Sequence, residues 1–117
     1  MPKVLKFRQP VPLEVKMRTQ RRAPRMNSRV PLRVEWMSGA SGPSLQEHAQ
    51  TRVVNYYGCL LVSPQAMPIE QKLRITNLAT RQSMLGVVVW QGKKQMEGWE
   101  LGVELVQPRT DFWGMEI

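Results

Sequence analysis

The sequence predicts an all-β domain, a small antiparallel six-stranded β-barrel that follows a basic N-terminal arm. Three observations support this fold class. Short segments alternate apolar and polar residues with the two-residue period of a half-buried strand. Residues that favour turns, mainly Gly, Pro, Ser and Asn, separate these segments at intervals of about 8–15 residues. No segment keeps the period of an amphipathic helix for more than about one turn, so an antiparallel barrel or sandwich is expected.

Three strands are expected in the first half of the barrel. Residues 30–36 (VPLRVEW) alternate four apolar side chains with Pro, Arg and Glu, which predicts a half-buried strand. Residues 37–46 are rich in Gly and Ser and are predicted to form a loop. Residues 47–58 carry a second strand that ends near Val54, and residues 59–62 (CLLV) form a short apolar third strand.

Three more strands are expected in the second half. Residues 63–71 contain two prolines and are predicted to be a connection, whereas residues 72–77 (KLRITN) alternate as a fourth strand. The β-branched segment 83–90 (SMLGVVVW) predicts a fifth strand, in which the glycine suggests a bulge. Residues 91–98 (QGKKQMEG) are predicted to be a polar hairpin loop, and residues 99–106 (WELGVELV) a sixth strand with one apolar face.

The expected organisation is a basic extension over residues 1–20, a barrel domain over residues 21–107 and a short tail over residues 108–117. The 117 residues fit one domain, and the 42% of hydrophobic residues can fill one core. The sequence contains no run of about 18 apolar residues, so no membrane-spanning helix is expected. The single cysteine, Cys59, allows no internal disulfide, which fits a reducing compartment. A cytoplasmic protein without an attached output domain is therefore expected.

Positive charge is concentrated in the first third of the chain. Residues 1–34 hold ten Lys and Arg against one acid, a formal charge of +9, whereas the other 83 residues carry −1. Within residues 19–29 (TQRRAPRMNSR) lie four arginines: Arg21, Arg22, Arg25 and Arg29. Pro24 disfavours a helix here. The guanidinium groups would project from an extended arm, where each can pair bidentately with phosphate or a guanine edge. A solvated tail is the alternative interpretation.

The sequence indicates a binding module and not an enzyme. The one histidine, His48, lies on a strand without cysteines or carboxylates at the spacing of metal ligands. Cys59 has no basic neighbour in sequence that would lower its pKa, so it is interpreted as a small buried thiol. The carboxylates are scattered, and no Gly-rich phosphate loop precedes a helix. We therefore expect no catalytic residues, no metal and no cofactor.

The order of these features resembles the PilZ domain, the bacterial receptor module for the second messenger cyclic di-GMP. The family pattern is Arg-x-x-x-Arg in an N-terminal arm, followed further along by Asp/Asn-x-Ser-x-x-Gly at the end of a strand. RRAPR matches the first motif, and VVNYYG matches the second by its glycine. The segments VVVW and WELGVELVQP also resemble strands of this family. The resemblance covers about residues 20–107 and implies the PilZ-like split barrel.

The resemblance implies a cyclic di-GMP site between the arm and the turn after the second strand. In the family, the arm arginines hold guanine and phosphate. The implied ligand-binding residues are Arg21, Arg22, Arg25, Asn55 and Gly58. Asn55 stands where the family has Ser, and Val53 where it has Asp or Asn. Losing a charge-assisted hydrogen bond at Val53 costs about 1.5–3 kcal/mol, roughly a ten- to hundredfold weaker affinity.

Three functions follow from these residues. The first is a cyclic di-GMP receptor that acts in trans on an unknown protein partner. The second is a PilZ-like adaptor that has lost nucleotide binding and works by protein contacts, which Val53 and Asn55 favour. The third is a small-barrel nucleic-acid binder with a basic arm. The candidates for an aromatic platform are Trp36, Trp90, Trp99 and Trp113. Of these, Trp36 and Trp99 occupy the apolar phase of their strands and are expected in the core. The charge of −1 outside residues 1–34 argues against nucleic acid as a partner.

Overall fold

The structure is a computed structural model that describes residues 26–39 and 42–115. These residues form seven strands: β1 (Met26–Asn27), β2 (Pro31–Met37), β3 (Ser44–Asn55), β4 (Gly58–Ser63), β5 (Lys72–Asn77), β6 (Gln82–Gln95) and β7 (Gly98–Leu105). The described part of the chain contains no helix that could cross a bilayer. The all-β prediction is confirmed.

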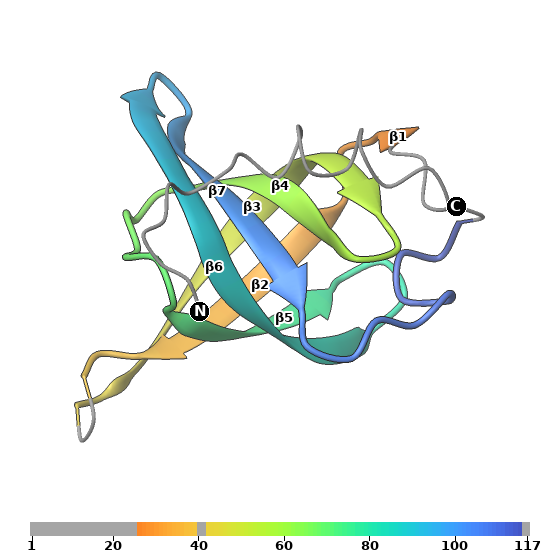
Figure 1. Cartoon of the computed structure of the whole chain (residues 1–117), viewed down its shortest axis with the longest axis horizontal. Helices are drawn as coiled ribbons and strands as arrows, with labels where there is room; N and C mark the ends of the chain where they lie inside the picture. Colours follow the sequence, from red (N-terminus) through yellow and green to blue (C-terminus); the bar gives the residue numbers. More distant parts are fainter. Residues whose placement is uncertain (1–25, 40–41, 116–117) are drawn as a thin grey trace, which may run out of the picture.

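Six of the strands close into an antiparallel ring (Figure 1). The order around the ring is β3-β2-β5-β6-β7-β4, and pairing of β4 with β3 closes it. Strand β1 lies outside the ring and pairs with β3. The predicted six-stranded antiparallel barrel is therefore confirmed, and β1 is an additional strand that the sequence pattern did not predict, because two residues are too short to show a period.

Alternate side chains point into the ring and form one hydrophobic core. Every ring strand contributes a fully buried apolar residue: Leu32 and Val34, Val54, Leu61, Ile75, Val88, and Val103. Burial of each such side chain stabilises the fold by about 1.5–3 kcal/mol. Trp36 is half-buried against this core, and Trp99 is also half-buried, so neither is a fully enclosed core residue.

Strands β3 and β6 are longer than predicted. Residues 44–46, expected in a loop, begin β3, and residues 91–95, expected in a hairpin loop, continue β6. The β2–β3 and β6–β7 hairpins both project beyond the ring (Figure 1). A hairpin that projects in this way has water on both faces, so its residues lose the apolar–polar alternation that marks a half-buried strand. Because these segments are polar and do not alternate, the sequence did not predict that they belong to strands.

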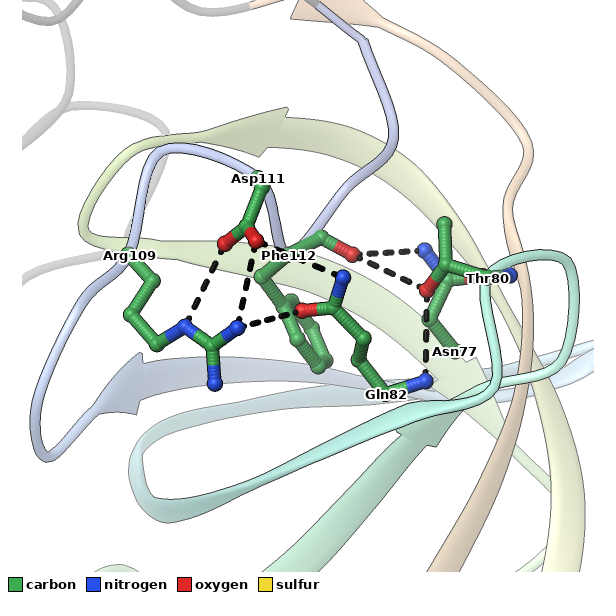
Figure 2. A network of polar contacts seen from close by, with 6 residues as sticks. All are labelled: Asn77, Thr80, Gln82, Arg109, Asp111 and Phe112. Carbon is green, nitrogen blue, oxygen red and sulfur yellow. Dashed lines mark hydrogen bonds and ion pairs between the residues drawn. The ribbon is translucent and has the colours of Figure 1, made fainter.

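The segment after β7 is packed on the end of the barrel. The sequence predicted a short tail at 108–117, yet Phe112 is fully buried and Trp113 is 2% exposed. Their rings meet edge to face with centroids 4.8 Å apart. Asn77 at the end of β5 donates its side-chain N–H to the Phe112 carbonyl at 2.9 Å, as Figure 2 shows. The two rings close this end of the core.

Figure 2 also shows the exposed polar contacts that hold this segment. The guanidinium of Arg109 donates to both carboxylate oxygens of Asp111, at 3.2 and 3.1 Å, and to the side-chain oxygen of Gln82 at 3.0 Å. The hydrogen bond from Arg109 lowers the pKa of the Asp111 carboxyl from its ordinary value. Gln82 begins β6, so this network connects the C-terminal segment to the ring.

Replacement of Phe112 by alanine tests whether this segment belongs to the core. We expect Phe112→Ala to lower the free energy of unfolding by about 3–5 kcal/mol, because it removes a fully buried ring and leaves a cavity. Urea denaturation followed by circular dichroism measures the loss. The control is Val106→Ala, which shortens a side chain that is 57% exposed. Equal, small effects of the two substitutions would contradict a core role for Phe112.

Candidate functional site

Strand β1 brings the end of the basic arm to the strand that carries the second motif. Arg21, Arg22 and Arg25 lie outside the described residues. The residue after Arg25 is Met26, which pairs with Val54 of β3, and Asn27 pairs with Val53. Met26 and Asn27, which directly follow the arm motif, therefore lie beside the strand that leads into the turn from Asn55 to Gly58.

A buried threonine of β3, Thr51, holds the segment between β1 and β2 against the barrel. The hydroxyl of Thr51, which is fully buried, accepts a hydrogen bond from the Val30 backbone N–H at 2.7 Å and donates one to the Ser28 carbonyl. The Ser28 N–H donates to the Arg52 carbonyl, and the Thr51 N–H donates to the Val30 carbonyl, each at 3.1 Å. Residues 28–30 form the break between β1 and β2. Thr51 thus satisfies backbone groups that the break removes from the strand ladder.

Asn55 builds the turn between β3 and β4. It is fully buried, and its side-chain oxygen accepts hydrogen bonds from the backbone N–H groups of Tyr57 at 2.8 Å and Gly58 at 3.1 Å. This arrangement is an Asx-type turn, in which a short amide side chain replaces a backbone acceptor. The Asn55 carbonyl also accepts a hydrogen bond from the indole N–H of Trp113 at 2.8 Å. The Asn55 side chain, which the resemblance implies as a ligand contact, therefore holds the turn in the described structure.

Gly58 is required by the close approach of strands. It is buried, and it pairs with Asn55 on one side and with Glu104 of β7 on the other. A Cβ atom at this position would lie 2.1 Å from the Val103 carbonyl oxygen, so any side chain would displace β7. The sequence suggested either positive φ or a close ligand for this glycine. The structure shows a close neighbouring backbone, and φ of Gly58 is not positive.

The two tyrosines of the turn connect it to the end of β7. The Tyr56 hydroxyl donates to the Pro108 carbonyl at 3.3 Å, and the Leu105 N–H donates to the Tyr57 carbonyl at 2.8 Å. The two rings meet edge to face with centroids 5.1 Å apart. Both side chains remain partly exposed, so their rings contribute to the surface near the turn.

A small apolar cluster lies on the outer face of the ring beside β1. Val53 of β3 pairs with Leu60 of β4, and Leu60 pairs on its other side with Gly102 of β7. Gly102 in turn pairs with Trp90 of β6, so the four residues form a row across neighbouring strands. Val53 and Leu60 are 4% and 6% exposed, and Trp90 packs partly buried against them. This outer apolar cluster, made of Val53, Leu60 and Trp90, is separate from the interior core.

The sequence named Trp90 as one of four candidates for an aromatic platform but did not predict which face of the sheet it occupies. Simple alternation would place Trp90 on the same face as Val88, which is fully buried in the interior. A bulge between Val88 and Trp90 shifts the register and turns the indole outward. A Cβ atom at Gly92 would lie 2.6 Å from the Trp90 ring, so this glycine leaves room for the indole. An unbroken apolar run such as VVVW shows no alternation, so the bulge could not be located from it.

Cys59 and His48 are the remaining reactive side chains that the sequence singled out. Cys59 is fully buried, and burial raises the pKa of its thiol. His48 is exposed on β3. Among residues 26–39 and 42–115, no three His, Cys, Asp or Glu side chains are grouped to hold a metal ion.

Comparison with known proteins gives no match: no family model, no curated protein and no solved structure is similar to this chain at a significant level. Its function is therefore inferred from the sequence motifs and from the geometry of the described residues.

Substitution of Thr51 tests the attachment of β1. We expect Thr51→Val to lower the free energy of unfolding by about 1–3 kcal/mol, because the Val30 N–H and the Ser28 carbonyl lose a buried partner. Amide hydrogen exchange should increase at residues 27–30 more than at the centre of β5. Thr110→Val, at an exposed position, is the control. Unchanged exchange at residues 27–30 would show that β1 is held by other contacts.

Proposed function

We propose that the chain is a PilZ-like receptor for cyclic di-GMP, and that the ligand is held between the basic arm and the outer face of β3. One observation carries the proposal. The pairs Met26–Val54 and Asn27–Val53 put the residue that follows the Arg-x-x-x-Arg motif beside the strand that ends in the second motif. These two motifs are 30 residues apart in sequence, counted from Arg25 to Asn55, and a shared site needs them to be adjacent.

The chemistry of the ligand fits the residue types near this junction. Cyclic di-GMP carries two phosphates and two guanines, and an arginine can pair bidentately with either group. Arg21, Arg22 and Arg25 would make these contacts from the arm. The half-buried indole of Trp90, in the outer apolar cluster, offers a flat surface on which a base could stack. Asn55 and Gly58 would act by fixing the turn against which the arm closes.

Ligand binding at this junction also suggests how the receptor would signal. A molecule that bridges the arm and the barrel would fix the arm against β3. This would change the surface that a separate partner protein contacts. The direct connection from Asn55 to Trp113 gives the C-terminal segment a contact with the same turn.

Isothermal titration calorimetry with cyclic di-GMP tests the proposal. We expect the wild-type protein to bind, and the double variant Arg21→Ala/Arg25→Ala to lose the heat signal, because both arm guanidinium groups are removed. The double variant Arg74→Ala/Arg81→Ala is the control, since it removes the same charge from exposed positions on β5 and in the turn before β6. Wild-type protein that gives no heat at a hundredfold excess of ligand would exclude the receptor function.

Substitution of Val53 tests the alignment of the second motif. We expect Val53→Asn to tighten cyclic di-GMP binding about two- to tenfold, which corresponds to one added hydrogen bond of about 0.5–1.5 kcal/mol. An uncharged amide is preferred to Asp because Val53 is only 4% exposed. Val62→Asn, on neighbouring β4, is the matched control. A thermal melt checks that both variants fold, and unchanged affinity in a folded Val53→Asn would show that the alignment is wrong.

A second candidate function is an adaptor that works by protein contacts without nucleotide. The observation in its favour is the outer apolar cluster, because Val53 replaces an acidic or amide residue and packs against Leu60 and Trp90. Apolar side chains of this kind suit a protein interface. The calorimetric experiment separates the two candidates, since an adaptor of this type gives no heat with cyclic di-GMP in any variant.

A further inference from the structure

A basic groove lies on the outer face of β3 and β4 and is bordered by Glu97 from the turn between β6 and β7. It consists of two hollows of about 310 and 320 Å³ that share Arg29 and Arg52. The side chains that carry its charge and polarity are those of Arg29, His48, Gln50, Arg52 and Glu97. Neither Asn55 nor Gly58 lines the groove, so it is distinct from the turn of the proposed cyclic di-GMP site.

The strand geometry places these polar groups in a row. His48, Gln50 and Arg52 are alternate residues of β3, and alternate residues share a face at a spacing of about 6.8 Å. Arg29 lies in the break between β1 and β2 and donates to the Gln50 side-chain oxygen at 3.4 Å. Two guanidinium groups therefore border the same groove from β3 and from the β1–β2 break.

The guanidinium of Arg52 has unused hydrogen-bonding capacity. One terminal nitrogen pairs with Glu97. Its Nε lies 3.9 Å from a Glu100 carboxylate oxygen, is buried, and has no hydrogen-bond partner in the described structure. A buried N–H without a partner is uncommon and requires an explanation. An oxyanion that accepts from both Nε and a terminal nitrogen would satisfy it with the bidentate geometry that arginine favours.

Glu97 is held at the edge of the groove by the hairpin. The next residue, Gly98, has φ of +135°, and a Cβ there would lie 2.5 Å from the Ser63 carbonyl oxygen, so the hairpin tip packs closely on the end of β4. Glu97 is 57% exposed, and an exposed ion pair contributes little to stability. A stronger anion can therefore displace the Glu97 carboxylate from Arg52 without disturbing the barrel.

We propose that the basic groove binds the phosphate group of a small phosphorylated ligand, and that Glu97 competes with that group for Arg52. A phosphate carries more charge than a carboxylate and has three acceptor oxygens. It could accept from Arg52 and Arg29 together, with the His48 and Gln50 side chains as further hydrogen-bonding groups. This site goes beyond the proposed cyclic di-GMP site and does not depend on it.

Titration with inorganic pyrophosphate tests the proposal. Amide chemical shifts of the ¹⁵N-labelled full chain should change around residues 28–29 and 48–52. Arg52→Gln should weaken binding at least tenfold, and Glu97→Gln should tighten it at least threefold. The matched controls are Arg81→Gln and Glu70→Gln, which change the net charge equally at exposed positions outside the groove and should leave affinity within twofold. Equal effects of Glu97→Gln and Glu70→Gln would show attraction by net charge alone and overturn the proposal.

A further variant separates this site from the arm. The double variant Arg21→Ala/Arg25→Ala should bind pyrophosphate with affinity within threefold of wild type. Loss of pyrophosphate binding in this variant would assign the phosphate to the arm and overturn the proposal. Absence of binding by both wild type and Glu97→Gln would also overturn it. A failure to bind cyclic di-GMP would exclude only the proposed receptor function, because different arginines carry it.

Discussion

The turn from Asn55 to Gly58 depends on one buried side chain, and both the closed ring and the candidate site depend on that turn. The Asn55 side-chain oxygen holds two backbone N–H groups, which reverses the chain between β3 and β4. Pairing of β4 with β3 closes the ring, and Gly58 lets β4 approach β7 on its other side. A different geometry at this turn would leave β4 misaligned with both neighbours. The surface beside Val53 would change with it.

Distant parts of the chain meet at this turn. Thr51 fixes the break before β2, and so holds β1 beside Val53. The C-terminal segment arrives from the other end of the chain, where the Trp113 indole donates to the Asn55 carbonyl. Because these contacts share neighbouring residues of β3, a change at one of them can alter the others through a few bonds. Such short paths are a physical basis for coupling between the turn, the β1–β2 break and the C-terminal segment.

Charge and apolar surface are separated along the outer face of β3. The outer apolar cluster begins at Val53, whereas Arg52, its neighbour in sequence, belongs to the basic groove. The bulge between Thr51 and Val53 allows consecutive residues to reach the outer face. The outer apolar cluster and the basic groove therefore lie side by side on one strand. The carboxylates of Glu97 and Glu100 both lie beside Arg52 of the groove.

The sequence by itself determined the fold class and the six ring strands, because alternation at positions such as Leu32 and Val34 records local burial. It also located the charge of the arm. Only the tertiary structure decided that Asn55 and Gly58 shape a turn, that Trp90 faces outward and that Phe112 belongs to the core. Each of these depends on a partner distant in sequence. A turn motif, an apolar run or a short tail looks the same in sequence whatever strand or ring lies opposite it.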